Sequence, residues 1–252
     1  MVTSDQRRRQ LARDKYARQQ QRRAEAQRRA KRRTTVIAAS LAVVLAAGGA
    51  VYASVQFLGD DAKNAKNTEE TASGEPKMAI EAKGAYAFSL GTNEGDITIT
   101  MDAAKTPRTV NSFKHLADKK YFDGTKCHRL TTAGIFVLQC GDPEGSGMGG
   151  PGYTIPDENL DALGKAGADG KVTYKAGTVA MANTGQPGTG GSQFFLVYKD
   201  SKLPPQYTPF GTIDAAGLAA VQKVGAAGAE GGQGDGAPKK PVTIERATVS
   251  AK

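Results

Sequence analysis

The sequence has few of the residues that most often carry covalent or metal chemistry. Among 252 residues there are two cysteines and two histidines. Neither His115 nor His128 has a convincing serine or cysteine partner for an acyl-transfer triad. Two cysteines without a matching set of histidines do not form a typical four-ligand zinc site. The composition therefore argues against nucleophilic and metal-dependent chemistry, and we expect neither a cofactor nor a metal.

Acidic residues are scarce at the N-terminus. Residues 1–33 carry 13 Lys or Arg and three acids, a net charge of +10, whereas the whole chain has a net charge of +9. The rest of the chain is therefore close to neutral, and the basicity belongs to a tail. We interpret this tail as a cytoplasmic topology signal. Attraction to an anionic inner leaflet is an alternative, and nucleic-acid binding is disfavoured because no aromatic platform accompanies the charge.

Charged residues are absent from positions 34–59, a run of 26 mostly apolar residues. Such a run is long enough to span the bilayer core as a helix. Arginines precede it and Asp60 and Asp61 follow it, so the positive-inside rule places the N-terminus in the cytoplasm. A buried globular helix of this length would rarely lack a polar face. A cleaved signal peptide is the stronger alternative, since Val51-Tyr52-Ala53 offers small residues for cleavage, but its charged and apolar regions would both be unusually long.

We therefore predict a signal-anchor in a single-pass protein of the cell membrane, with everything after the helix outside the cytoplasm. Residues 60–84 are mostly polar or small and are expected to form a flexible linker. The remaining segment, 85–252, has the composition of a folded domain.

The domain shows mainly the period-two alternation of strands. Ile97, Ile99 and Met101 fall on one face of a predicted strand, and Thr106 with Pro107 predicts the start of a helix. Further strands are expected near 127–130, 136–139, 178–182, 193–198 and 242–249, and a second helix over 215–224, followed by a mobile connection over 225–236. Many short strands with two helices indicate a mainly β fold, a closed or nearly closed antiparallel barrel.

Five segments of the domain form a recognisable series. They are His128-Arg129, Phe136-Val137-Leu138-Gln139, Met181-Ala182-Asn183, Gly191-Ser192-Gln193-Phe194-Phe195 and Pro209-Phe210-Gly211. Together they resemble the cyclophilin family of peptidyl-prolyl isomerases over roughly residues 85–250. The resemblance implies a closed eight-stranded antiparallel barrel capped by two α-helices, and isomerisation of X-Pro bonds.

The resemblance also implies roles for individual residues. Arg129 matches the catalytic arginine, which would bond the proline nitrogen as amide conjugation is lost. The positions that match substrate-binding residues are Phe136, Val137, Phe195 and Leu203 in the proline pocket, and Gln139, Ala182, Asn183, Gln193 and Tyr207 around it. Asn183 would offer its main-chain carbonyl. Taken singly, the arginine could be a surface ion pair, the apolar residues core packing, and Asn183 and Gln193 ordinary strand and turn partners.

The sequence departs from the family pattern at three places. The span from Arg129 to Asp142 is two residues longer than usual, through Thr131-Thr132-Ala133-Gly134. Lys202 stands where sensitive members have a tryptophan that binds cyclosporin, and Tyr207 stands where a histidine is common. We therefore expect weak cyclosporin binding.

Cys127 and Cys140 fall in the part of the chain predicted to lie outside the cytoplasm, where disulfides persist. Their strands look like neighbours across a connection, so a bridge between them is open, but sequence alone does not show whether their Cβ atoms face each other.

The function expected from these observations is isomerisation of X-Pro bonds in proteins that fold outside the membrane, by a monomer that binds no nucleic acid. The alternative is a non-catalytic proline-binding or chaperone module on the same fold, which would hold a segment without accelerating its rotation. Intact Arg129 favours the enzyme.

Overall fold

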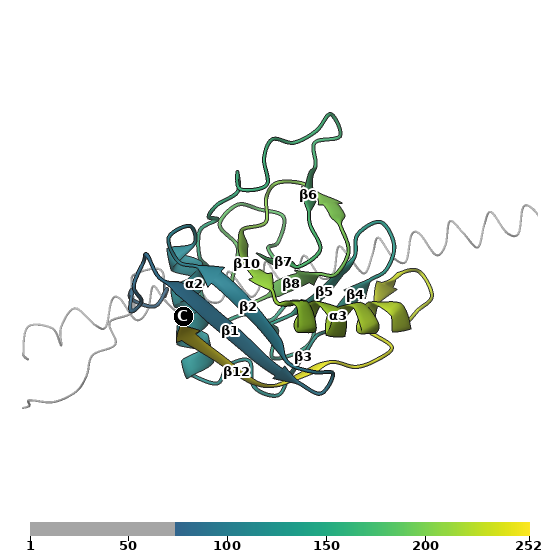
Figure 1. The fold of residues 1–252 in the computed structure, drawn as a ribbon, viewed down its shortest axis with the longest axis horizontal. Helices are drawn as coiled ribbons and strands as arrows, with labels where there is room; N and C mark the ends of the chain where they lie inside the picture. The colour runs from purple at the N-terminus through teal and green to yellow at the C-terminus, as the bar shows by residue number, and fades with distance from the viewer. Residues whose placement is uncertain (1–73) are drawn as a thin grey trace, which may run out of the picture. The chain divides into compact units, whose positions relative to one another are not determined.

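The computed structural model describes residues 74–252 (Figure 1). The predicted tail, the predicted membrane-spanning segment and most of the linker lie outside them. In the described part of the chain, no helix is long and apolar enough to cross a bilayer. The helices within residues 74–252 are α2, Pro107–Asp118, and α3, Ala215–Ala227. The strands are β1 Ala85–Thr92, β2 Ile97–Asp102, β3 Thr125–Lys126, β4 Arg129–Thr131, β5 Val137–Cys140, β6 Val172–Tyr174, β7 Thr178–Met181, β8 Phe194–Val197, β9 Ser201–Leu203, β10 Pro209–Ile213, β11 Asp235–Gly236 and β12 Thr243–Ala251.

Ten of these strands form one curled antiparallel sheet in the order β11-β4-β5-β8-β7-β10-β2-β1-β12-β3, while β6 and β9 pair separately. Two of the ten, β3 and β11, have only two residues each, which leaves eight longer strands. β3 lies at one end of the sheet and β4 is next to the other end, yet only Cys127 and His128 separate them in the chain. The chain itself therefore brings the two ends of the curled sheet together.

A disulfide between Cys127 and Cys140 lies at this junction. It ties the residue that follows β3 to the last residue of β5. The main-chain N–H of Cys127 donates to the carbonyl of Val242, just before β12. The junction is thus held both covalently and by the backbone of a neighbouring strand.

The first hairpin follows the predicted alternation. Ile97, Ile99 and Met101 are buried along β2, with more exposed residues between them. The turn before β2 closes with a 3.1 Å hydrogen bond from the N–H of Gly95 to the carbonyl of Thr92. Gly95 has φ of +116°, a conformation that glycine adopts without a Cβ clash.

The start of α2 differs from the prediction in its cap. Thr106 occupies the cap position, but its hydroxyl donates to the carbonyl of Asp102 instead of accepting from the helix. The carboxylate of Glu158 accepts the N–H groups of Arg108 and Thr109, at 3.1 and 2.9 Å. A negative group fits this end because the helix dipole is positive there. A long-range contact therefore supplies the cap.

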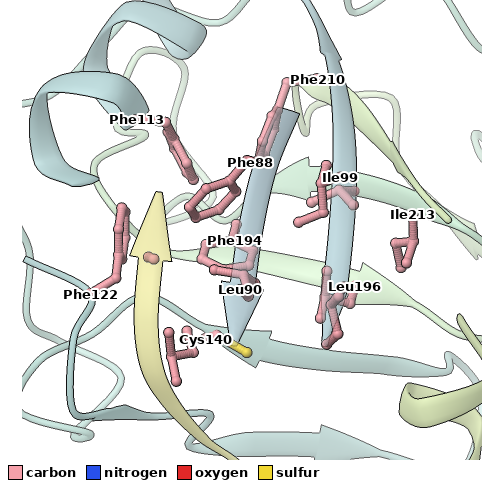
Figure 2. Packing of buried hydrophobic residues seen from close by; sticks show 14 of the residues in the cluster. Phe88, Leu90, Ile99, Phe113, Phe122, Cys140, Phe194, Leu196, Phe210 and Ile213 are labelled. Carbon is pink, nitrogen blue, oxygen red and sulfur yellow. The ribbon is translucent and has the colours of Figure 1, made fainter. Parts of the chain in front are cut away.

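The main core is formed by the inner face of the sheet together with residues of α2 and α3, and it is rich in phenylalanine (Figure 2). Phe113 of α2 packs 4.8 Å from Phe210 and 5.3 Å from Phe88, between ring centroids. Phe194 of β8 lies 5.6 Å from Phe113. Edge-to-face and tilted ring contacts of this kind stabilise beyond the apolar area they bury. The strand that carries Phe194 is thus fixed from its inner side.

The second helix begins as expected and ends three residues later than predicted. Asp214 caps α3 by accepting the N–H of Gly217 at 3.0 Å. The glycine-rich segment 225–236, which the sequence analysis interpreted as a mobile connection, contains the last turn of α3, an isolated bridge between Ala229 and Pro238, and β11. Backbone pairing with β4 therefore gives this segment a defined structure.

Candidate active site on the outer face of the sheet

Three of the predicted site residues, Arg129, Gln139 and Phe195, lie on the outer face of neighbouring strands of the sheet. In the sheet register, Arg129 of β4 lies opposite Gln139 of β5, Gln139 opposite Phe195 of β8, and Phe195 opposite Ala180 of β7. Residues directly opposite each other in antiparallel strands point to the same face. The alternate residues Leu130, Leu138 and Leu196 belong to the main core. The register therefore assembles the site as one row across the sheet.

A directional chain of hydrogen bonds runs along this row. Arg129 Nη1 donates to Gln139 Oε1 at 3.3 Å, and Gln139 Nε2 donates to Gln193 Oε1 at 2.8 Å. Gln193 Nε2 then donates to the carbonyl of Gly149 at 2.8 Å. An arginine can only donate and a carbonyl can only accept, so the two ends fix the orientation of both amides. Gln193 was expected to support Arg129, and it contacts the arginine indirectly, through the side chain of Gln139.

Arg129 also pairs with Asp235, a residue that the sequence analysis did not single out. Nε and Nη2 donate to the two carboxylate oxygens at 2.8 and 2.7 Å. The hydrogen bond that Arg129 donates to Asp235 raises the pKa of Arg129, and the same bond lowers the pKa of Asp235. The guanidinium is therefore charged and held along one edge.

An apolar cluster separate from the main core lies beside the arginine. Val137 and Phe195 are 2% and 5% exposed, so almost all of their surface is covered. The partly buried residues that pack against this cluster are Ile135, Leu163, Ala182, Leu203 and Tyr207. The ring of Tyr207 meets that of Phe195 edge-on at 5.5 Å. The structure thus brings together five of the predicted substrate-binding residues, namely Val137, Ala182, Phe195, Leu203 and Tyr207.

Phe136 is not part of this cluster. Its ring packs 6.0 Å from that of Tyr198, with Lys199 Nζ 4.5 Å above it, and it lines a pocket of about 630 Å³ beside α3. Because side chains alternate along a strand, the outward positions of Gln139 and Val137 are continued by Ile135. Ile135, and not Phe136, therefore packs against the apolar cluster that contains Val137 and Phe195.

A groove of about 580 Å³ lies on the other side of Gln139 and Gln193. Ala182 and Asn183 form part of its wall, and residues 147–154 form another part. Asn183 Nδ2 donates to the carbonyl of Gln206 at 2.7 Å, and its Oδ1 accepts the N–H of Gly185 at 3.0 Å. These two bonds fix the backbone of residue 183 at the rim.

The glycine-rich loop of this groove is organised around a buried carboxylate. Asp142 accepts the N–H groups of Glu144, Gly147 and Gly149 and the hydroxyl of Ser146. Burial alone would raise the pKa of Asp142, but these four bonds together lower it. A Cβ on Gly149 would collide with the Asp142 carboxylate, so the position requires glycine. Asp142 thus fixes the backbone of Gly149, whose carbonyl accepts the hydrogen bond from Gln193.

His128 stands between the disulfide and this loop. Both ring nitrogens are buried, and no residue in the described part of the chain bonds either of them. Burial lowers the pKa of His128, so the ring is held in its neutral form.

Lys202, elsewhere at the site, is exposed, and its Nζ lies 3.6 Å from Oδ2 of Asp169. Among residues 74–252 there is no cluster of three or more His, Cys, Asp or Glu that could hold a metal ion.

The family model described as cyclophilin type peptidyl-prolyl cis-trans isomerase/CLD matches residues 87–249. The chain belongs to the cyclophilin family. Among curated relatives, this cyclophilin is 50% identical over 162 residues to the probable peptidyl-prolyl cis-trans isomerase B of Mycobacterium tuberculosis, which covers 63% of this chain and 52% of the relative. It is 37% identical over 145 residues to a peptidyl-prolyl cis-trans isomerase of Helicobacter pylori, with 57% of this chain and 82% of the relative covered. The chain thus spans about half the length of the mycobacterial isomerase B relatives that it matches.

Solved structures agree on the fold. A cyclophilin of Cryptosporidium parvum superimposes with a TM-score of 0.53 at 24% identity, covering 67% of this chain and 99% of that one. A second structure of the same protein, determined in the presence of the dipeptide Ala-Pro, gives a TM-score of 0.52.

Proposed function

We propose that this cyclophilin is a peptidyl-prolyl cis-trans isomerase that acts on X-Pro bonds of extracytoplasmic proteins by non-covalent transition-state stabilisation. The uncatalysed rotation faces a barrier of about 18–20 kcal/mol because amide resonance must be broken. No proton need be removed. The reaction therefore suits a site that offers a fixed cation and an apolar surface rather than a nucleophile.

The observation that carries the proposal is the position of Arg129. The register places its guanidinium one strand away from Gln139 and two strands away from Phe195, on the same face. As the bond twists, the proline nitrogen loses conjugation and its lone pair becomes an acceptor. A donor fixed beside it binds the transition state more strongly than the ground state, which lowers the barrier.

The apolar cluster and the groove beside Arg129 suit different parts of the substrate. The apolar cluster of Val137, Phe195, Leu203 and Ile135 suits the proline ring, which has only carbon to present. The groove lined by Gln139, Ala182 and Asn183 suits the polypeptide before the proline, where amide and carbonyl groups need partners. Holding one side of the bond while the other turns is what rotation requires.

The test is the cis-to-trans rate of an Ala-Pro peptide with the full chain in mild detergent. We expect the parent to accelerate exchange and Arg129→Ala to lose about 100-fold in kcat/KM, the usual cost of removing one transition-state donor. The matched control is Arg246→Ala, which removes an exposed arginine of β12 and should keep the parent rate. If the folded parent binds the peptide without accelerating exchange, the domain is the proline-binding or chaperone module instead.

Cyclosporin should bind weakly. The exposed ammonium of Lys202 stands where sensitive members present an indole ring, so the drug would lose an apolar contact. Titration of the purified chain with the drug measures this, and submicromolar affinity would contradict the expectation.

A further inference from the structure

The firmest contact of the Arg129 side chain is with Asp235. Two hydrogen bonds of 2.8 and 2.7 Å to its carboxylate oxygens occupy Nε and Nη2, while Nη1 donates to Gln139 at 3.3 Å. We propose that Asp235 is a positioning residue, which holds the guanidinium plane so that the Nη1 side faces the substrate row. The role rests on the proposed isomerase function, because it acts only through Arg129.

Asp235 is itself fixed by a short hairpin. β11 pairs with β4, with Asp235 opposite Thr131 and Gly236 opposite Leu130. The N–H of Thr132 donates to the carbonyl of Gly234 at 2.7 Å, and the N–H of Glu230 donates to the carbonyl of Ala237 at 2.7 Å. The carboxylate is therefore carried by backbone that is bonded on both sides.

Close packing adds to this support. Gly234 has φ of +76°, and a Cβ there would lie 2.8 Å from the Cβ of Ala133. Ala133 belongs to the connection that makes the span from Arg129 to Asp142 two residues longer than the common family pattern. The hairpin that carries Asp235 thus docks on the segment in which this chain departs from that pattern.

Asp235 affects the rate in two opposing ways, by fixing the position of Arg129 and by reducing its positive charge, and the first is the larger. An arginine side chain has several rotatable bonds. If they are free in the unbound enzyme, fixing them when the transition state binds costs conformational entropy. A carboxylate that grips two donors of the planar fork removes that freedom. Asp235 also reduces the positive field of Arg129, but its side chain is 52% exposed, so water screens this opposing effect. Removing the carboxylate should therefore slow the enzyme.

The test compares Asp235→Asn and Asp235→Ala with the parent in the full chain, using the Ala-Pro exchange assay. Asparagine keeps one acceptor oxygen, so we expect kcat/KM to fall about tenfold in Asp235→Asn and further in Asp235→Ala, mainly through kcat. The control is Asp118→Asn, which breaks an exposed 2.7 Å ion pair with Lys114 on α2 and should keep the parent rate. In the Arg129→Ala background, Asp235→Asn should add no further loss.

A second readout is independent of catalysis. The Nε–H resonance of Arg129 in a ¹⁵N NMR spectrum should exchange slowly with water in the parent and rapidly in Asp235→Asn. An unchanged resonance, an unchanged or faster kcat, or a loss confined to KM would each overturn the role of Asp235. A parent that does not accelerate exchange would overturn the isomerase proposal and this role with it, whereas an active parent unaffected by Asp235→Asn overturns only the latter.

Discussion

Residues 135 and 136 are adjacent in the chain but serve different parts of the molecule. Ile135 packs against the outer cluster with Val137 and Phe195, whereas Phe136 packs on the main core beside Tyr198. The two-residue extension before them does not alter the alternation of β5. We therefore expect Ile135, and not Phe136, to contact the proline ring of a substrate.

Paired alanine substitutions separate these two roles. Ile135→Ala should lower kcat/KM for the Ala-Pro peptide about fivefold, since roughly 1 kcal/mol of apolar contact with the proline ring is lost. Phe136→Ala should keep kcat/KM within about twofold, because its ring contacts no member of the outer cluster, and should lower the melting temperature instead. The reverse result would mean that Phe136 reaches the substrate.

His128 should make stability depend on pH. Its folded pKa lies below the ordinary value of 6.5 because burial disfavours the charged ring. Just below pH 6.5 the unfolded chain therefore binds more protons than the folded chain. The contribution of neutral His128 to the free energy of unfolding is complete above pH 6.5 and is lost as the pH falls toward the folded pKa. We expect the melting temperature to drop between about pH 7 and pH 5.

Substitution identifies the group responsible. His128→Asn should flatten that part of the pH profile. A profile of the His128 variant that still follows the parent would show that another group causes the pH dependence.

At the scale of the element, α2 depends on a residue far away in sequence. Glu158 binds two N–H groups of its first turn and the hydroxyl of Thr109, at 2.8 Å. Glu158→Ala should therefore lower the free energy of unfolding by about 1–2 kcal/mol, which is the usual cost of losing a cap together with a favourable charge at the helix start. Urea titration measures it, with the exposed Asp161→Ala as control. Equal stability of the two variants would exclude the cap.

The elements differ in how far sequence alone predicts them. The strong alternation around Ile99 and the proline at the start of α2 are local signals, and both elements form where they were expected. β9 and β11 have three and two residues, which is too short for any period to be recognised. They exist because a partner strand supplies the hydrogen bonds, and that information is not local.

The same limit applies to the site. Val137, Gln139 and Phe195 could be aligned by motif, and counting back two residues from Val137 would also have indicated Ile135. Asp235 could not be identified in this way, because it lies in a glycine-rich segment whose approach to β4 is a tertiary contact. Thr106 stands at the N-cap of α2 as expected, but the acceptor of the helix N–H groups is Glu158, about 50 residues away, which no local pattern indicates.

At the scale of the whole molecule, the predicted signal-anchor would hold the domain at the membrane surface. We expect the full chain to stay in the membrane fraction after alkaline carbonate extraction, because an apolar helix of 26 residues partitions into the bilayer core. A variant lacking residues 34–59 should be soluble. An intact mass corresponding to a chain that begins after Ala53 would show instead that the segment is a cleaved signal peptide.

The pairing of β1 with β12 has a consequence for the biosynthesis of the domain. Tyr86 lies opposite Ala251, so the first and last strands of the fold are neighbours in the sheet. Ribosomes synthesise the chain from its N-terminus. Almost the entire domain must therefore be made before β12, the second partner of β1, can pair with it. Contacts this distant in sequence also form slowly. Closure of the sheet therefore requires that β12, Thr243–Ala251, has been synthesised, and a nascent chain arrested before residue 243 would leave one edge of β1 open to pairing with other molecules.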